Sequence, residues 1–258
     1  MSSPRRIWLT GASSGIGYEL AAQLLAQGHR VALSARTLEP LQGLQARFPS
    51  QVLLAPGDLA DAEQVRAIGE HIASAWGALD QVILNAGNCE YVDVRQFEAA
   101  MIERVVKTNL FASAYCIEAA LPLLRKGTQP HLVGVASAVT FLPLTRSEAY
   151  GASKAGVRYL YESLRVDLAS EGIDVTVVSP GFVKTPLTDR NDFAMPMMWT
   201  AEKAARHIAL RLHKRPLEIA FPGPFIAMLR AMAWLPGRLS LLLTKRMVRN
   251  TTKESEQA

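Results

Sequence analysis

The sequence predicts an α/β fold: a doubly wound parallel sheet of about seven strands with helices on both faces and a helical extension at the C-terminus. Short apolar runs alternate with longer segments of helical periodicity along the 258 residues, a pattern typical of parallel strands joined by crossover helices. The runs are nearly continuous in Val, Ile, Leu and Ala, as expected where helices cover both faces of a sheet. We expect strands at residues 7–10, 30–34, 52–55, 81–84, 131–136, 175–178 and 218–221.

The composition indicates one ordinary globular domain. Hydrophobic residues make up 49% of the chain and charged residues 20%, and α/β folds of this length need no division. Cys89 and Cys116 belong to no C-x-x-C pair, so the sequence predicts neither a disulfide framework nor a metal site. The first residues lack the apolar region of a signal peptide, and these features together favour a cytoplasmic protein.

The first strand leads into a glycine-rich turn. Residues 10–17 read Thr-Gly-Ala-Ser-Ser-Gly-Ile-Gly, and a helical pattern follows over residues 18–25. Glycines let backbone N–H groups approach a pyrophosphate closely, and the helix N-terminus adds about half a positive charge. The turn therefore predicts a dinucleotide site; the alternative is a helix cap and tight turn without a ligand. The residues expected to hold the dinucleotide here are Gly11, Ser13, Ser14, Gly15, Ile16 and Gly17.

The end of the second strand indicates which dinucleotide binds. NAD enzymes usually carry an acidic residue there to hold the ribose hydroxyls, whereas this chain has Ser34, Arg36 and Thr37. Arg36 can pair with a 2′-phosphate, and Ser34 or Thr37 can add hydrogen bonds. We therefore expect NADP(H) in preference to NAD(H). The alternative is that Arg36 stacks on adenine or lies in solvent.

A tyrosine and a lysine lie four residues apart in the segment 147–169, where a helix is expected. Tyr150 and Lys154 would share one face of this helix. Lowering the pKa of a tyrosine to near 7 takes roughly 4 kcal/mol, which a close ammonium and an oxidised nicotinamide can supply. Ser137, just past the fifth strand, can hydrogen-bond a substrate oxygen. Tyr150 is thus the expected general acid/base; the alternative gives all three residues ordinary structural roles.

The chain resembles the short-chain dehydrogenase/reductase family over residues 6–212, both in the motifs that it contains and in their order along the sequence. The motifs beyond the first turn are Asp58-Leu59, Asn85-Ala86-Gly87, Asn109, Ser137, the run 150–154, Pro180-Gly181 and Thr185. Leu84 stands where the family often has a second Asn. The resemblance implies an NAD(P)-dependent oxidoreductase in which Lys154 contacts the nicotinamide ribose and a water relay runs through Asn109.

The expected cofactor site extends well beyond the first turn. By the resemblance, Asp58 accepts a hydrogen bond from the adenine amine; alternatively it caps the helix that begins near Asp61. The other residues expected in this site are Leu59, Asn85, Ala86, Gly87, Pro180, Gly181, Val183 and Thr185, together with Tyr150 and Lys154.

The segments expected to line the substrate site are apolar. They follow Ser137 and the Pro-Gly turn, and a small polar sugar would need more hydrogen-bond donors than they offer. We therefore expect a lipophilic ketone, aldehyde or secondary alcohol as substrate; the alternative is that several of these side chains belong to the core. The residues expected to contact the substrate are Ser137, Val139, Phe141, Tyr150 and Phe182.

The basic residues concentrate at the C-terminal end. Residues 201–258 carry a net charge of +7, whereas residues 1–200 carry −2. Lys and Arg alternate there with apolar residues instead of forming a run, so no nucleic-acid surface is predicted. We expect residues 1–215 to form the dinucleotide-binding and catalytic domain, residues 216–250 a helical extension of it, and residues 251–258 a disordered tail.

Two short helices are expected in the extension, at residues 225–235 and 238–249. Neither is long enough to span a bilayer, which takes about 20 apolar residues. They would form a lid, a contact in a homo-oligomer, or a peripheral membrane contact through residues 225–249.

The expected function is that of an NADP(H)-dependent oxidoreductase. The alternative is a dinucleotide-binding regulatory or scaffolding protein that has no turnover. Ser137, Tyr150 and Lys154 are all present, and this favours the enzyme.

Overall fold

The computed structural model describes residues 4–191 and 193–245 and contains the predicted parallel sheet. Seven strands lie in the order β3-β2-β1-β4-β5-β6-β9, and every neighbouring pair is parallel. The strands are β1 (Arg6–Thr10), β2 (Arg30–Ser34), β3 (Val52–Leu54), β4 (Gln81–Leu84), β5 (His131–Val135), β6 (Asp174–Pro180) and β9 (Glu218–Phe221). The predicted fold class is confirmed, and the strand bounds differ from those expected by at most two residues at either end.

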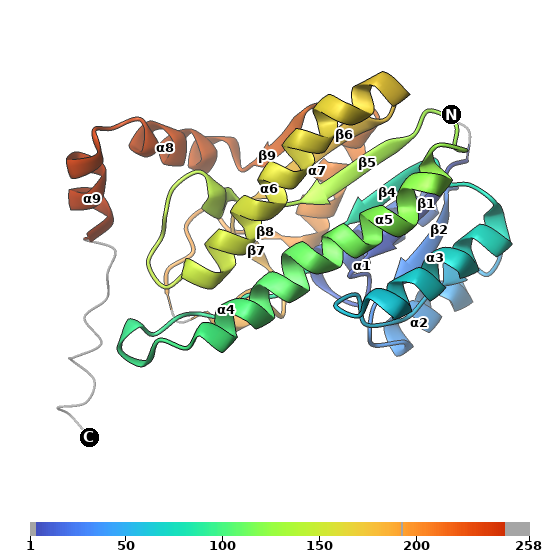
Figure 1. The fold of residues 1–258 in the computed structure, drawn as a ribbon, viewed down its shortest axis with the longest axis horizontal. Helices are drawn as coiled ribbons and strands as arrows, with labels where there is room; N and C mark the ends of the chain where they lie inside the picture. Colours follow the sequence, from blue (N-terminus) through green and yellow to red (C-terminus); the bar gives the residue numbers. More distant parts are fainter. Residues whose placement is uncertain (1–3, 192, 246–258) are drawn as a thin grey trace.

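Helices cover both faces of this sheet (Figure 1). They are α1 (Gly15–Ala26), α2 (Glu39–Arg47), α3 (Ala62–Trp76), α4 (Ala99–Val106), α5 (Ala112–Leu124), α6 (Glu148–Leu168), α7 (Ala201–Leu212), α8 (Gly223–Ala233) and α9 (Gly237–Lys245). A second, short parallel sheet pairs β7 (Val183–Lys184) with β8 (Trp199–Thr200). The last two helices lie where the sequence predicts them, but the part of the second beyond residue 245 and the tail 251–258 lie outside the described residues.

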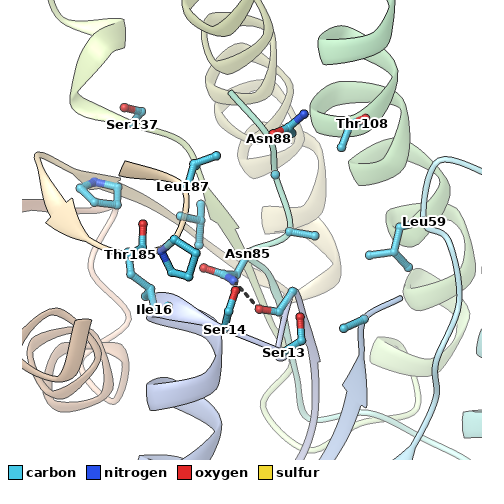
Figure 2. Close-up of a pocket in the computed structure, with 18 of the residues that line it drawn as sticks. Ser13, Ser14, Ile16, Leu59, Asn85, Asn88, Thr108, Ser137, Thr185 and Leu187 are labelled. Atoms are coloured by element: carbon cyan, nitrogen blue, oxygen red, sulfur yellow. Dashed lines mark hydrogen bonds between the residues drawn. The ribbon is translucent and has the colours of Figure 1, made fainter. Parts of the chain in front are cut away.

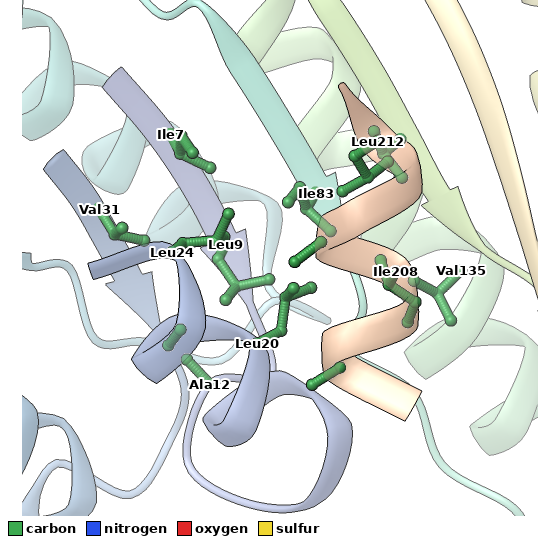
Figure 3. Close-up of a cluster of buried hydrophobic side chains, with 14 of the residues drawn as sticks. Ile7, Leu9, Ala12, Leu20, Leu24, Val31, Ile83, Val135, Ile208 and Leu212 are labelled. Atoms are coloured by element: carbon green, nitrogen blue, oxygen red, sulfur yellow. The ribbon is translucent and has the colours of Figure 1, made fainter. Parts of the chain in front are cut away.

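The alternation of side chains along each strand divides the core into two layers. On one face, Ile7 and Leu9 of β1 pack in a buried cluster with Leu20 of α1 and Ile208 of α7 (Figure 3). On the other face, Trp8 packs in a cluster that includes side chains of α3, α5 and α6. Both faces of β1 are therefore buried, which explains why its sequence is apolar without alternation.

Close packing of α6 against the sheet requires a glycine in β5. A Cβ atom on Gly134 would lie 2.4 Å from the ring of Tyr161, a fully buried side chain of α6. No real carbon contact is this short, so the absence of a side chain at position 134 sets how closely α6 approaches the sheet. This helix carries Tyr150 and Lys154 in its first two turns, so its height above the sheet fixes their position relative to the strand ends.

Candidate active site

A cavity of about 380 Å³ opens at the carboxyl ends of the central strands (Figure 2). Polar side chains from distant parts of the chain converge on it, as expected at the edge where the order of a doubly wound sheet reverses between β1 and β4. The predicted site residues in its lining are Gly11, Ser13, Ser14, Gly15, Ile16, Arg36, Asp58, Leu59, Asn85, Ala86, Gly87, Ser137, Tyr150, Lys154, Pro180, Gly181, Val183 and Thr185.

The glycine turn after β1 passes very close to its neighbours. Gly11 and Gly15 have φ values of +67° and +53°, in the left-handed region that favours glycine. A Cβ atom on Gly11 would lie 2.8 Å from the Cα of Ala86, and one on Gly17 would lie 2.1 Å from the Gly11 carbonyl oxygen. Gly17 is buried beneath the turn, so it shapes the cavity by close packing and not as part of its lining.

The helix that follows this turn directs its N-terminus at the cavity. Ser14 precedes α1 in an extended conformation, and its side chain makes no capping hydrogen bond. Gly15 and Ile16, the first residues of the helix, line the cavity. The first N–H groups of a helix have no partner within it, so this end of α1 offers donors and positive partial charge to an anionic ligand.

Two polar side chains join the turn to the loop after β4. The Thr10 hydroxyl accepts hydrogen bonds from the backbone N–H groups of Asn85 and Ala86, at 3.0 and 3.1 Å. In return, the Asn85 side chain donates to the carbonyl oxygens of Thr10 and Gly11 (Figure 2). Asn85 therefore fixes two loops of the cavity against each other, a role that its motif alone did not reveal.

Asn109 lies in a π-helical segment, η2 (Lys107–Phe111), which joins α4 to α5 without a break in the helical backbone. Its side chain is buried and fully engaged. The carbonyl oxygen accepts from the N–H of Asn88 at 2.7 Å, and the amide donates to the Asn88 carbonyl at 2.9 Å and to the Ser153 hydroxyl at 2.8 Å. Such π-segments occur frequently at functional sites, and this one connects the loop after β4 to the helix that carries Tyr150.

Tyr150, Lys154 and Ser137 come together at one end of the cavity. Lys154 is buried, and its ammonium donates a 2.8 Å hydrogen bond to the Val135 carbonyl oxygen at the end of β5. Its Nζ lies 6.0 Å from the centre of the Tyr150 ring. Ser137 begins the short helical turn η3 (Ala138–Thr140), and its hydroxyl accepts from the N–H of Val139 at 3.2 Å. Tyr150 and Lys154 of α6 and Ser137 after β5 therefore line the same part of the cavity.

Burial shifts the pKa values of Tyr150 and Lys154 in opposite directions. Burial raises the pKa of Tyr150 to about 12, partly offset by the Ser137 hydroxyl, and burial lowers the pKa of Lys154 to about 8. In the protein without ligands, removing a phenolate from water costs more than these neighbours return. The expected lowering involves the ammonium together with an oxidised nicotinamide, so it stays a prediction for the complex.

At the ends of β2 and β3, the predicted residues divide into two groups. Arg36 and Asp58 are exposed on the cavity lining. Ser34 is fully buried instead, and its hydroxyl accepts a 2.9 Å hydrogen bond from the indole of Trp8. Asp61, not Asp58, caps α3 by accepting from the N–H groups of Glu63 and Gln64, which leaves the Asp58 carboxylate outside that cap.

The apolar residues expected to touch the substrate lie beside the cavity and outside its lining. Phe182 packs against Phe193 and Phe225, with ring centres 6.0 and 5.4 Å apart. Phe141 lies under the guanidinium groups of Arg158 and Arg230, and Val139 donates its N–H to Ser137. Val139, Phe141 and Phe182 thus form an apolar region next to Ser137, called the apolar surround below. Their packing agrees in part with the alternative that these side chains belong to the core.

Several lining residues were not predicted. Most of them are neighbours of predicted residues, and their proximity to a motif is the only indication in the sequence that they belong to the site. They are Ala35, Gly57, Ala60, Asn88, Thr108, Val135, Ala136, Pro186 and Thr188, whereas Leu187 belongs to the apolar segment after the Pro-Gly turn that was expected to line the substrate site. Thr108 and Asn88 flank the Asn109 connection described above, which no sequence pattern indicates.

Comparison with known proteins identifies the family. The model of the short chain dehydrogenase family matches residues 5–194. The chain belongs to this family. The short-chain dehydrogenase described here is also 35% identical to an uncharacterized oxidoreductase of Myxococcus xanthus, over 92% of this chain and 95% of that protein. A second uncharacterized oxidoreductase, from Mycobacterium tuberculosis, is 34% identical over 92% and 96% of the two chains. The expectation of an oxidoreductase is confirmed.

Solved structures share the fold of this short-chain dehydrogenase. A short-chain dehydrogenase from Streptomyces avermitilis has a TM-score of 0.82 at 24% identity, covering 95% of this chain and 97% of that one. The structure of ElxO with NADP bound has a TM-score of 0.77 at 23% identity, covering 87% and 99%. In the part of the chain that the structure describes, none of the helices has the length and apolar character needed to cross a membrane.

Proposed function

We propose that this short-chain dehydrogenase uses NADP(H) to interconvert a lipophilic ketone or aldehyde and the corresponding alcohol, with Tyr150 as general acid/base. The observation that carries the proposal is the convergence of Ser137, Tyr150 and Lys154 on the cavity that also contains the glycine turn. A reacting carbon at this end of the cavity would lie within reach of both a proton donor and a bound dinucleotide.

The residues of the cavity fit a dinucleotide. Its glycine turn leaves room that Cβ atoms would fill, and a Cβ on Gly15 would come within 2.9 Å of Thr185 from the opposite wall. The N-terminus of α1 would hold the pyrophosphate, Arg36 a 2′-phosphate, and Asp58 the adenine. Lys154 and the segment from Pro180 to Thr185 would hold the nicotinamide end. The bound nicotinamide supplies the chemistry of hydride transfer.

The proton chemistry belongs to Tyr150. A pKa of about 12 keeps its phenol protonated at neutral pH, which is the form that donates a proton to a carbonyl oxygen during reduction. Ser137 would orient that oxygen and stabilise the charge that develops on it. Alcohol oxidation needs the phenolate instead, and positive charge on Lys154 and on the oxidised cofactor would favour that form.

The NADP(H) preference predicts a strong effect of charge reversal at Arg36. In Arg36→Glu the specificity ratio, kcat/KM with NADPH divided by kcat/KM with NADH, should fall by about tenfold to a hundredfold, because a charge-assisted hydrogen bond is replaced by repulsion. Arg211→Glu, an exposed change on α7 outside the cavity lining, is the control. An unchanged ratio in Arg36→Glu would remove the argument from the 2′-phosphate.

The apolar surround predicts the substrate class. Oxidation of NADPH should be faster with medium-chain or cyclic ketones than with hydrophilic ketoses of similar size, because Phe141 and Phe182, the rings that lie beside the cavity next to Ser137, offer no hydrogen-bond partners for hydroxyl groups. A panel of carbonyl compounds and alcohols, followed by the absorbance of the reduced nicotinamide, measures this order. A faster reaction with hydrophilic ketoses or polyols than with medium-chain or cyclic ketones would contradict the lipophilic assignment.

A further inference from the structure

The last two helices expose an unusual amount of apolar surface. Trp234, between α8 and α9, is 90% exposed, and Leu239, Leu241 and Leu242 of α9 are 51%, 54% and 53% exposed. No residue of α9 is buried. Figure 1 shows α8 and α9 at the edge of the molecule, with α9 beyond the layers of the sheet. A helix without buried side chains gains little stability from packing, so we expect a partner to cover this surface.

The charge of the same region indicates which partner it suits. Residues 219–253 contain six Lys or Arg and no Asp or Glu. Arg238, Leu241, Leu242 and Lys245 follow one another at i, i+3, i+4 and i+7, so leucines and cations share one face of α9. All four are exposed. A protein partner would have to be both apolar and acidic over a short helix, whereas an anionic lipid surface combines these two properties throughout.

We propose that α8 and α9 dock this protein on the surface of an anionic lipid bilayer. The leucines of α9 and Trp234 would enter the boundary between headgroups and acyl chains, where indole rings are favoured. Arg238 and Lys245 would lay their methylene chains along the same apolar layer and keep their charges at the lipid phosphates.

The inner side of α8 connects this surface to the cavity. Phe225, Ile226 and Leu229 are buried in a cluster with Ala138 and Leu142, the residues just after Ser137. Arg230 lies over Phe141 and forms an ion pair with Glu218 of β9 at 2.6 Å. A docked α8 would therefore place the apolar surround of Ser137 next to the bilayer. Only the relevance of this orientation to a lipophilic substrate rests on the proposed function; the docking does not.

Sedimentation with lipid vesicles tests the docking without any substrate. The full chain should pellet with phosphatidylcholine vesicles that contain phosphatidylglycerol, and less with phosphatidylcholine alone. The variant Leu239→Ser/Leu241→Ser/Leu242→Ser should lower the partition coefficient at least about tenfold. Replacing either Arg238 or Lys245 by Gln should lower the partition coefficient about fivefold at low salt and by a smaller factor at high salt. The control Val94→Ser/Leu210→Ser/Leu217→Ser removes equally exposed apolar side chains elsewhere and should pellet like the unmodified protein.

Two results would overturn the proposal. One is that the unmodified protein stays in the supernatant with both kinds of vesicle, or that the leucine variant pellets as well as it does. The other is that the leucine variant has a lower molecular mass than the unmodified protein in sedimentation equilibrium while neither binds vesicles, which would assign the surface to a second copy of this chain. Circular dichroism and thermal unfolding establish that each variant is folded, and the Gln variants test the docking even if the leucine variant is not.

Discussion

Replacing Tyr150 by Phe is expected to lower kcat/KM for ketone reduction by about 10²–10⁴-fold, the usual effect of removing a general acid. The change deletes one oxygen and leaves the ring in place, so the packing of α6 should survive. Dinucleotide affinity, measured by fluorescence titration, should change little, because the turn after β1 and the loop after β4 are untouched. The rate is followed by the absorbance of the reduced nicotinamide.

The matched control lies on the same helix. Tyr159→Phe removes the same atom from a side chain that is 77% exposed, and its kcat/KM should equal that of the unmodified protein. If Tyr150→Phe retained activity within a few-fold of the unmodified protein on a good ketone substrate, the proposed proton donor would be wrong. If the unmodified protein bound dinucleotide but turned over no carbonyl compound or alcohol, the non-catalytic alternative would be favoured.

Replacing Gly17 by Ala is expected to weaken dinucleotide binding by at least about tenfold and to lower the free energy of unfolding by about 1–3 kcal/mol. The new Cβ would overlap the Gly11 carbonyl oxygen at 2.1 Å and the Asn85 amide nitrogen at 2.5 Å. To relieve this overlap, the start of α1 must move away from the glycine turn. This movement would separate the N–H groups of the turn from those of the first turn of α1, both of which face the cavity. Fluorescence titration and denaturant unfolding measure the two effects.

Gly43 supplies the control, because it also lies inside a helix, α2, but has no atom within 4 Å of where its Cβ would stand. Gly43→Ala should leave dinucleotide affinity unchanged and stabilise the protein by up to about 1 kcal/mol, the difference in helix propensity. Equal behaviour of the two alanine variants would mean that the close approach at Gly17 does not shape the site.

Local patterns were sufficient for the fold and for most of the cavity. Each strand is a continuous apolar run between turn residues, and parallel strands bring their carboxyl ends to one edge whatever lies between them. Gly11, Arg36 and Asn85 could therefore be assigned to one edge of the sheet from their positions after strands, whereas Tyr150 was assigned from its spacing to Lys154 and from the family resemblance.

The sequence is least informative where contacts between distant segments determine the surroundings of a side chain. Ser34 has the right position in the sequence, but β1 places the Trp8 indole against it. The pKa of Tyr150 depends on how much water the folded chain excludes, which no spacing of residues records. The π-helical turn at Asn109 has side-chain partners 21 and 44 residues away, and the sequence around it shows only ordinary helical periodicity.

The engagement of Asn109 bears on how kinetic data at this position are to be understood. One amide group holds together three stretches of chain: the π-helical segment η2, the loop after β4 at Asn88 and α6 at Ser153. Any substitution that removes this group loosens the alignment of substrate and cofactor walls at once. A slow variant at position 109 would therefore report misaligned reactants as readily as an interrupted proton path, and only solvent isotope effects measured beside the rate would separate the two.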